Sequence, residues 1–435
     1  MPSIKTVFIN AQLCIDGQLV NGKTLTISDG TIASIESEPH TTDTDREEVV
    51  DLEGLIISPG FIEIQTNGLR GFHFTHFDDE ATYSQKLEEV ARYLPQTGVT
   101  GFYPTVPTVH SDEFKKILPC LAPCSIPGGA SILGAHAEGP YLHRSKKGAH
   151  NATLFHLPST PPTQIYGPAA LTNQTLKLVT LAPELPDTVP LIHDLVSKGI
   201  RVSLGHSSAT YAQGLAALSA GATCLTHTLN AMPPLHHRDP GLAGLITLLP
   251  TSPDPPNPNT TPLSPPYFSL IADGNHLHPS ITTLLFRANP THAILTTDSI
   301  ELAGLPDGTY PGHSQIPFRQ TKQGSRVVIE GTETLIGGCA GLDECVRNLV
   351  AWSGCGVAGA VRCVTENVVG LMGEEGGGQG EVGCGGRGGF GCVGVWGGGE
   401  GDVGGGCEGL GWNGVRVDRG GVGQLRVEFN GGYVV

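Results

Sequence analysis

Hydrophobic and polar residues alternate with a period of two from residue 4 to about residue 53. Short runs such as TVFIN, QLCIDGQLV and KTLTISDG are separated by turn signals of the Asp-Gly type. A two-residue period places successive side chains on opposite faces of a strand, and Asp-Gly pairs favour tight turns. This part of the chain is therefore predicted to form a small antiparallel sheet.

From Leu55 onward, short apolar runs alternate with helix-like segments such as 81–96, 188–199 and 210–221. The candidate strands cover residues 55–65, 100–106, 131–139, 178–184, 201–207, 224–230, 268–276 and 293–299. Eight strands that alternate with helices over about 240 residues predict a (β/α)8 barrel. An open doubly wound sheet is the main alternative, but no glycine-rich phosphate turn follows the first strand.

Two segments depart from this order. The proline-rich run 251–266 suits neither helix nor strand and is predicted to be a surface loop between the sixth and seventh units. The tail from Leu371 holds 27 of the 61 glycines and no lysine. Glycine at that density weakens helices and strands, although strand-like runs survive in GCVGVW, NGVRVD and LRVEF.

Composition narrows the class of protein. The chain has 435 residues, 39% of them hydrophobic, which is enough for a sizeable core. Its formal net charge of −16 disfavours binding to nucleic acid or to anionic membranes. No apolar run reaches the roughly 18 residues of a membrane span, and the N-terminus lacks a signal-peptide pattern. Only Cys120 and Cys124 have a ligand-like spacing, so we expect reduced thiols and a cytoplasmic protein.

Four polar residues stand at the ends of predicted strands, namely Glu138, His206, His227 and Asp298. The carboxyl ends of barrel strands meet at one face, so these side chains are expected to converge. Two imidazoles and two carboxylates suit a catalytic divalent metal such as zinc, with three ligands and an open position for water. Each residue alone could equally be a buried polar group satisfied by the backbone, but four at equivalent strand ends favour a metal site.

The flanking residues fit this interpretation. Ser207 or Ser208 could cap a helix that begins just after His206. Glu138 precedes Gly139-Pro140, a sharp turn that would hold the carboxylate at the rim of the barrel. Asn230 follows His227 by about one turn.

The motifs GAHAEGPYL, KKGAHN, LGHSSA, THTLNAM, HHRDPG, IADGNH and TTDSIELAGLPDG follow one another in the chain. From about Ile4 to Glu366, the chain resembles the N-acetylglucosamine-6-phosphate deacetylase family of the amidohydrolase superfamily. The resemblance implies a metal-dependent (β/α)8 hydrolase barrel over 55–366. A small β-sandwich domain would be formed by residues 1–54 and by the glycine-rich segment 367–435, whose folding is expected to be weakened.

The same resemblance implies an activity and a cofactor. The expected reaction is hydrolysis of the acetamide of N-acetylglucosamine 6-phosphate to glucosamine 6-phosphate and acetate, in amino-sugar catabolism. In PGFIEIQTNG, Gln65 and Asn67 stand where many metal-dependent amidohydrolases have two histidines. We therefore expect a single divalent metal ion per subunit, with zinc as the expected ion.

Site residues follow from the resemblance, motif by motif. Glu138, His206 and His227 would bind the metal. Asp298 would act as general base and acid, while His150 helps to polarise the acetamide carbonyl. The implied substrate-binding residues are Asn151, Asn230, Ala231, Arg238, His276, Leu335, Ile336 and Gly337.

Within the substrate-binding set, Arg238 and His276 would hold the 6-phosphate. Residues 335–337 would lie in a loop that closes over the substrate, although Ile336 replaces the usual Ser or Ala. In this family a phosphate contact can come from the partner subunit, and a homodimer is expected.

Two other functions stay open at this point. The first is another mononuclear amidohydrolase, although those acting on cyclic amides or aminated bases usually need the His-x-His pair. The second is a catalytically impaired barrel with a structural or regulatory role, which the run GCGGRGGFGCV in the tail makes worth testing. Arg238 could instead pair with Asp239 at the surface. His236, His237 and His278 are interpreted as local groups and not as ligands.

Overall fold

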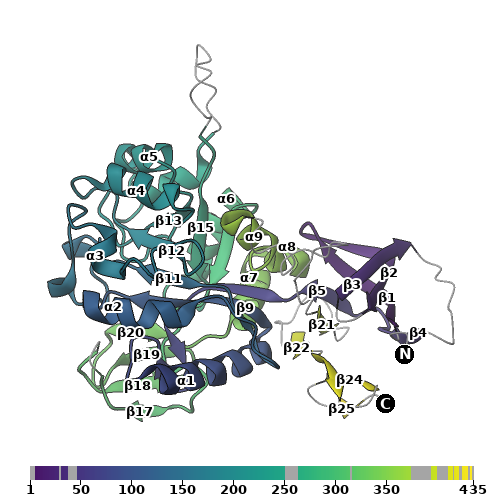
Figure 1. Ribbon diagram of the computed structural model, residues 1–435. Helices are drawn as coiled ribbons and strands as arrows, with labels where there is room; N and C mark the ends of the chain where they lie inside the picture. The colour runs from purple at the N-terminus through teal and green to yellow at the C-terminus, as the bar shows by residue number, and fades with distance from the viewer. Residues whose placement is uncertain are drawn as a thin grey trace.

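In the computed structural model, the described residues are 5–28, 31–37, 47–249, 263–313, 316–373, 393–398, 410–414, 416–420, 424–429 and 432–433. A large barrel and a separate β domain lie next to each other, and strands from the two ends of the chain meet in the β domain (Figure 1). The fold predicted from the sequence is confirmed.

Eight parallel strands form the barrel, and each one coincides with a strand predicted from the sequence. They are β6 (Phe61–Thr66), β9 (Val99–Pro107), β11 (Ala135–Glu138), β12 (Leu176–Leu181), β13 (Arg201–Leu204), β14 (Cys224–Leu225), β15 (Tyr267–Ile271) and β16 (Ala293–Thr296). The short β10 (Ser131–Ile132) also pairs with β9. Between β6 and β16 the sheet closes through a bridge from Thr66 to Ser299 and through the Asp298 N–H, which donates to the Gln65 carbonyl (2.9 Å).

Helices cover the outside of the barrel, as the helical segments predict. They are α1 (Glu80–Tyr93), α2 (Ser111–Ile117), α3 (Pro162–Tyr166), α4 (Thr188–Ser197), α5 (Tyr211–Ser219), α6 (Pro279–Ala288), α7 (Leu342–Ser353), α8 (Gly356–Arg362) and α9 (Glu366–Met372). The unit after β14 differs, because there a 3₁₀ helix, η5 (Leu242–Thr247), takes the place of an α-helix.

Helix α5 shows why one helix begins where it does. Its N-cap is Thr210, whose side chain accepts a hydrogen bond from the Gln213 N–H, while the Gln213 side chain accepts one from the Thr210 N–H. This reciprocal capping box satisfies two amide groups that the first helical turn leaves unpaired. The prediction that Ser207 or Ser208 caps this helix is therefore wrong, because the helix begins after Thr210.

The run 55–65, predicted as one strand, consists of two strands. Strand β5 (Ile56–Pro59) pairs with β1 in the β domain, whereas β6 belongs to the barrel. Because proline has no backbone N–H to donate in a sheet, the strand is interrupted at Pro59, and β6 begins two residues later. At Gly60 a Cβ atom would lie 2.2 Å from the Thr100 hydroxyl oxygen, so only glycine fits this crossing. The residue limits of the two domains stay a prediction.

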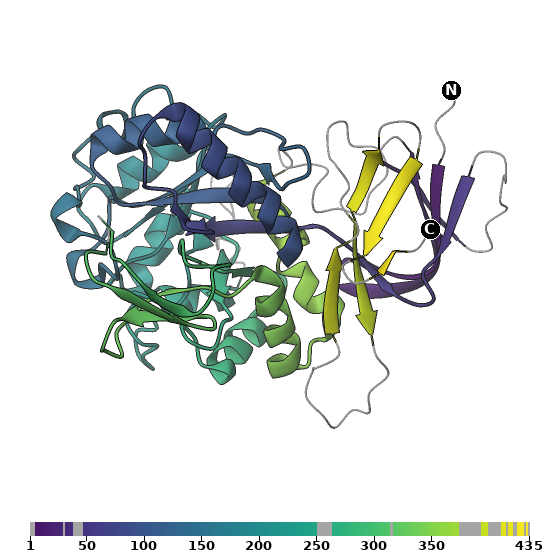
Figure 2. The same ribbon diagram turned by 90° about the horizontal axis from the view of Figure 1, so that it is seen from below.

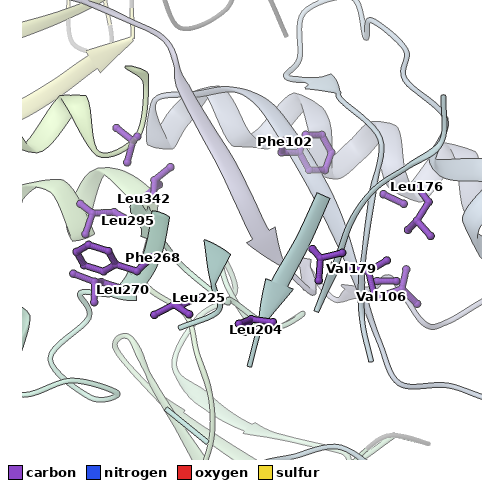
Figure 3. Close-up of a cluster of buried hydrophobic side chains, with 14 of the residues drawn as sticks. Phe102, Val106, Leu176, Val179, Leu204, Leu225, Phe268, Leu270, Leu295 and Leu342 are labelled. Atoms are coloured by element: carbon purple, nitrogen blue, oxygen red, sulfur yellow. The ribbon is translucent and has the colours of Figure 1, made fainter. Parts of the chain in front are cut away.

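The main hydrophobic core lies between the barrel strands and the surrounding helices. Figure 3 shows side chains of this core from several strands, among them Phe102, Val106, Leu204 and Phe268, together with Leu342 from α7. Alternate residues of the same strands face the other way, as Tyr103 and Ile294 do in a second buried cluster. The alternation of strand side chains thus separates the helix-facing core from the interior of the barrel.

The β domain joins the two ends of the chain. Strands β1 (Lys5–Ile15), β2 (Gln18–Ser28), β3 (Thr31–Ser37), β4 (Glu47–Asp51), β5, β21 (Val393–Gly398) and β22 (Leu410–Gly414) form its larger sheet, and β23 (Arg416–Gly420), β24 (Gln424–Phe429) and β25 (Gly432–Tyr433) form its smaller one. Strand β21 pairs antiparallel with β5, and the C-terminal strands lie beside the N-terminal ones (Figure 2). The three strand-like runs of the glycine-rich tail are therefore strands.

Two small sheets belong to loops of the barrel. A hairpin of β7 (Gly68–Leu69) and β8 (Phe72–His73) follows β6. A four-stranded sheet of β17 (Gly308–Tyr310), β18 (Gln320–Gln323), β19 (Arg326–Ile329) and β20 (Leu335–Gly338) is inserted after β16. Most of the predicted proline-rich loop, residues 251–262, lies outside the described residues. No helix in the described part of the chain has the length and apolarity to cross a membrane.

Candidate active site

Glu138, His206 and His227 converge at the carboxyl ends of their strands, as the sequence predicts. Glu138 ends β11, whereas the two histidines follow β13 and β14 within two residues. Glu138 Oε1 lies 3.1 Å from His206 Nε2 and 3.0 Å from His227 Nε2, and the two Nε2 atoms are 3.1 Å apart. All three side chains are buried, and together they form a group that could hold a metal ion.

Main-chain contacts set which nitrogen of His206 faces this point. His206 Nδ1 lies 2.8 Å from the carbonyl oxygen of Lys146, which can only accept a hydrogen bond. Nδ1 therefore carries the proton, and the Nε2 lone pair is directed toward Glu138 and His227. The backbone at Gly148 makes this approach possible, because its φ is +54° and a Cβ there would lie 3.1 Å from the imidazole of His206.

The spacing of the three atoms fits a tetrahedral metal ion. Zinc lies about 2.0–2.2 Å from nitrogen and oxygen ligands, so neighbouring ligand atoms of a tetrahedral site are about 3.3–3.6 Å apart. The observed separations of 3.0–3.1 Å are close to that range. Buried His227 Nδ1 has no hydrogen-bond partner in the described part of the chain. Its Nε2 faces the same point as that of His206.

Burial and the contacts with Glu138 shift the pKa values of the two histidines in opposite directions. Burial and the neighbouring His150 lower the pKa of His206 to about 4, so its ring is neutral, as a metal ligand must be. Burial disfavours charge on His227 as well, but contacts with Glu138 outweigh that effect and raise its pKa. Although burial opposes ionisation of Glu138, hydrogen bonds from His150, His206 and His227 hold its pKa well below the usual range. The carboxylate is thus ionised and ready to bind a cation.

His150 lies at the edge of this group with a defined tautomer. The backbone N–H of Thr108 donates to His150 Nδ1 (3.2 Å), so in the neutral ring the proton is on Nε2. That nitrogen lies 3.4 Å from Glu138 Oε2. His150 therefore presents an N–H donor to the same space that the metal ligands face.

Asp298 is held beside Glu138 by the Gln-x-Asn pair at the end of β6, Gln65 and Asn67. Asn67 Nδ2 donates to Asp298 Oδ1 (2.7 Å), and Gln65 Nε2 lies 3.2 Å from the same oxygen. Gln65 Nε2 also donates to Glu138 Oε1 (2.9 Å), so one amide group joins the two carboxylates. Burial and the charge of Glu138 raise the pKa of Asp298. A carboxylate in this setting is suited to accept and return a proton.

A layer of polar side chains lies under the site inside the barrel. His136 Nε2 is 2.9 Å from the Thr180 hydroxyl, which is 2.8 Å from the Thr226 hydroxyl. The Thr226 hydroxyl is in turn 2.6 Å from that of Ser203. These groups satisfy one another away from water and support the strand ends from below. His136, in the motif HAE, is thus part of this structural network.

Among the predicted phosphate-binding residues, His276 is half-buried and oriented by a carboxylate. Its Nδ1 lies 2.7 Å from Asp273 Oδ2, and Gly338 at the end of β20 lies against its ring. Burial opposes ionisation of Asp273, but the contact with His276 keeps its pKa below the usual value. Arg238 is exposed, and among the ion pairs of described residues none joins it to Asp239. Asp239 instead accepts the N–H groups of Tyr211 and Gly241, so the alternative interpretation of Arg238 as its partner is not supported.

The remaining predicted substrate residues have varied surroundings. Asn151 is exposed, and its side-chain oxygen accepts the Thr153 N–H (3.0 Å), which leaves its amide nitrogen for other contacts. Asn230 Nδ2 is buried without a partner in the part of the chain that the structure describes. Ala231 has a φ of +49°, and its carbonyl accepts the Ser207 N–H (3.1 Å).

The segment Leu335–Gly337, predicted as a loop, belongs to strand β20, so that prediction of its conformation is wrong. Strand β20 pairs with β19 and meets Ser299 through Gly338, close to Asp298 in the chain. Ile336 packs on the small apolar cluster of Ile300, Leu302 and Val327. Apolar packing and ladder hydrogen bonds both favour a strand here.

Several groups that orient the site residues were not assigned from the sequence. Thr108 and the Lys146 carbonyl set the histidine tautomers, and Asp273 orients His276. Glu184, in LAPE after β12, accepts the Ser207 hydroxyl (2.7 Å) and so fixes the turn after His206. Only Asp273 carried a signal, since it stands three residues before His276. Partners such as Thr108, 42 residues away from His150, are visible only in the folded chain.

Comparisons with known proteins show several relatives of this chain. No family model matches the chain. It is 35% identical to the N-acetylglucosamine-6-phosphate deacetylase of Caenorhabditis elegans, over 82% of this chain and 80% of the relative. It is 38% identical to the enzyme of that name from Danio rerio, over 74% of this chain and 77% of the relative. An N-acetylgalactosamine-6-phosphate deacetylase of Escherichia coli is 32% identical, over 81% of this chain and 85% of the relative.

A solved structure supports the fold. The N-acetylglucosamine-6-phosphate deacetylase of Pasteurella multocida superposes with a TM-score of 0.74 at 24% identity, covering 90% of this chain and 95% of that one. The curated relatives match most of the chain at more than 30% identity. The chain therefore belongs to the N-acetylglucosamine-6-phosphate deacetylase family of the amidohydrolase superfamily.

Proposed function

We propose that this protein hydrolyses the acetamide of N-acetylglucosamine 6-phosphate to glucosamine 6-phosphate and acetate, in amino-sugar catabolism. The observation that carries this proposal is the convergence of three metal-ligand atoms with Asp298, which Gln65 joins to Glu138. Relatives that carry this activity in their names share most of the chain. A catalytically impaired barrel is disfavoured, because each group that the chemistry requires is present and in contact.

Glu138, His206 and His227 would hold one divalent cation, and two imidazole nitrogens and one carboxylate suit zinc. When bound, such an ion lowers the pKa of a water molecule and polarises a carbonyl oxygen. Water and an amide are poor reaction partners without that help. Gln65 and Asn67 supply no imidazole at the end of β6, and their amide nitrogens bond to Glu138 and Asp298, which supports a single ion.

Asp298 would take the proton of the attacking water and return it to the amine leaving group. Two amide N–H donors hold its Oδ1, so the carboxylate has a fixed direction before substrate arrives. A carboxylate that is already oriented loses no conformational freedom in the reaction step, and this lowers the barrier. The addition of water to the carbonyl carbon and the loss of the amine then require one proton acceptor and one proton donor in turn, and one carboxyl group supplies both.

His150 would stabilise the oxygen of the acetamide as negative charge develops on it. The Thr108 N–H fixes the ring so that the Nε2 proton points into the site. A donor that is already oriented contributes more in a dry site than in water. The buried side chain of His150, 5% exposed, lies in such an environment.

The substrate's phosphate would be recognised by Arg238 and His276, since an exposed guanidinium is a strong phosphate donor even in an acidic protein. Asn151, Asn230, Ala231, Leu335, Ile336 and Gly337 would line the sugar. We also propose that the protein is a homodimer in the cytoplasm. The eight cysteines of the described chain are free thiols, as expected for a reducing compartment.

Release of acetate from N-acetylglucosamine 6-phosphate by the purified full-length chain tests this function. We expect activity that a chelator abolishes and that added zinc restores. The 4-epimer, N-acetylgalactosamine 6-phosphate, is the matched comparison, because one relative is named for it. Faster turnover of the epimer would assign the chain to that sugar. No acetate from either sugar in the presence of zinc would reject the proposal.

A further inference from the structure

Glu63 is a carboxylate in the middle of β6, on which every residue is buried. It is 1% exposed, and no ion pair with it occurs among the described residues. Burying a carboxylate costs several kcal/mol unless hydrogen bonds satisfy it. A buried carboxylate without an ionic partner in the described chain therefore points to a specific requirement at this position.

Three donors satisfy Glu63, and they come from the first and the last barrel strands. Oε1 accepts the Gln65 N–H (3.0 Å) and the Thr296 hydroxyl, while Oε2 accepts the Thr297 N–H (3.0 Å). The Thr296 hydroxyl is also 3.0 Å from the Gln65 carbonyl oxygen. Glu63 thus joins the end of β6 to the end of β16.

This contact lies at the seam where the barrel closes. At the lower part of the seam, the carbonyls of Cys363 and Val364 accept the N–H groups of Leu295 and Ile62, so the backbone after α8 separates the two strands. At the top, the strands meet directly, with the Asp298 N–H donating to the Gln65 carbonyl. Between these levels the Glu63 carboxylate replaces backbone pairing.

A pocket of about 50 Å³ lies beside Glu63 and Thr297, next to residues of α1 and α7. Side chains therefore do not fill this side of Glu63. Its hydrogen bonds are the contacts that join the two strand ends here.

The seam carries the groups that would handle the proton. Asp298 follows β16, and Gln65, which bonds both Asp298 and Glu138, lies on β6. The three metal ligands, by contrast, lie on or after β11, β13 and β14. A shift along the seam would move Asp298 relative to the ligands without dismantling the ligand set, and displacements near 1 Å can reduce turnover about 100-fold.

We propose that Glu63 is a positioning residue that sets Asp298 and Gln65 relative to the metal ligands. It acts through the Thr297 and Gln65 N–H groups and touches neither substrate nor metal. This inference rests on the proposed deacetylase function, because Asp298 is taken as the general base.

The test compares the purified full-length variant Glu63→Gln with the wild type. An amide of the same shape must turn a donor toward at least one of the N–H groups, so one hydrogen bond is lost. We expect kcat to fall about 10- to 100-fold, KM to change less than about twofold, and metal content to stay the same. Thr296→Val, which removes one donor, should lower kcat by a smaller factor and serves if Glu63→Gln does not fold.

Asn367→Ala is the matched control, because Asn367 anchors the opposite end of β16 through the carbonyls of Pro290 and Ala293. It should lower the melting temperature while kcat stays within about threefold of wild type. Wild-type kcat in both seam variants, or a loss of metal that accompanies the loss of activity, would overturn the positioning role. An inactive wild type would instead refute the proposed function.

Discussion

Each ring nitrogen at the site has its role set by the main-chain group that it meets. A carbonyl at His206 Nδ1 forces the lone pair of Nε2 inward, whereas an N–H at His150 Nδ1 forces a proton inward. Two side chains of the same type, 4.6 Å apart between ring centroids, therefore face the site in opposite tautomers. The first presents a lone pair and the second an N–H group, and neither tautomer is visible from the residue type alone.

Asp298→Asn should retain the metal while turnover collapses. The oxygen of the amide can keep the hydrogen bonds from Gln65 and Asn67, but the group cannot accept a proton from water. We expect kcat to fall about 10²- to 10⁴-fold with one metal ion still bound. Steady-state kinetics together with elemental analysis check this, and a variant that keeps more than about a tenth of wild-type kcat would show that Asp298 is not the base.

Arg238→Ala should weaken binding of the phosphorylated sugar. A charge-assisted contact with phosphate contributes about 1.5–3 kcal/mol, so KM should rise about 10- to 100-fold. Unphosphorylated N-acetylglucosamine provides the control, because its slow hydrolysis should be unchanged. An equal loss on both sugars would mean that Arg238 supports the loop and does not bind phosphate.

At the level of elements, the periodic pattern was sufficient for the barrel strands but not for their ends. Alternation identifies buried runs, yet it does not show that Gly60 must pass close to Thr100, where the run 55–65 divides between two sheets. Capping was also misassigned, because Ser207 bonds to Glu184 instead of beginning a helix. The contact at Gly60 comes from a residue far away in the sequence, which a local pattern cannot contain. The start of the helix, by contrast, depends on the local pair Thr210 and Gln213, which the sequence contains.

The site, too, contains residues that the sequence predicted and residues that it did not. Strand-end positions predicted the convergence of Glu138, His206, His227 and Asp298, because parallel strands bring their carboxyl ends together. The residues that orient them were missed. Glu63 occupies a position that reads as ordinary strand interior, and its partners on β16 lie 233 residues away or more.

Histidines in the loops of the barrel give an element-scale prediction about pH. His73 of β8 lies near His76, His313 and Glu301, which join the hairpin β7–β8 to the segment after β16. Lys86 and Asp78 also face His76. Burial lowers the pKa of His73 to about 3, and its effect exceeds that of the nearby Glu301, which raises the pKa. The folded protein therefore excludes a proton that the unfolded chain binds below a pKa of about 6.5.

The sign of the effect follows from linkage. Above a pH of about 6.5 the ring of His73 is neutral in both the folded and the unfolded chain, so it does not change the free energy of unfolding. Below that, the free energy of unfolding falls as pH drops from about 6.5 toward 3. At pH 5 the loss from this group is about 2 kcal/mol relative to pH 7.5. In urea unfolding of metal-free protein, His73→Gln should reduce the difference between the two pH values. The exposed His237→Gln should leave that difference unchanged, and an unchanged difference in both variants would contradict the prediction.

At the scale of the whole molecule, the barrel and the β domain contribute different parts of the structure. The barrel carries the converging side chains of Glu138, His206 and His227, whereas the C-terminal strands complete the sheet of the β domain by pairing with β5. Strand β5 runs directly into β6 across Gly60, so the β domain is covalently close to Gln65 and Asn67. This connection places the seam of the barrel at the junction of the two domains.

Metal content is the property of the whole chain that tests the site most directly. In the described part of the chain, only Glu138, His206 and His227 bring three ligand atoms within 4.8 Å of one another. The purified protein should therefore hold one divalent ion per chain, measured by elemental analysis. His206→Ala should lose that ion together with activity, because two ligands leave an incomplete coordination shell.

Removal of the metal should also lower the melting temperature. An ion that binds only the folded state adds RT ln(1 + [M]/Kd) to the free energy of unfolding, which is about 2.7 kcal/mol at one hundred times Kd. Zinc should therefore raise the melting temperature of the wild type but not that of His206→Ala. The melting temperature of the chelated wild type should equal that of the variant, apart from the effect of the substitution itself. A zinc-dependent rise in melting temperature that survives in His206→Ala would reveal a second site. The cluster of His73, His76, His313 and Glu301 would then be the first place to look for it, and the single-ion prediction would be wrong.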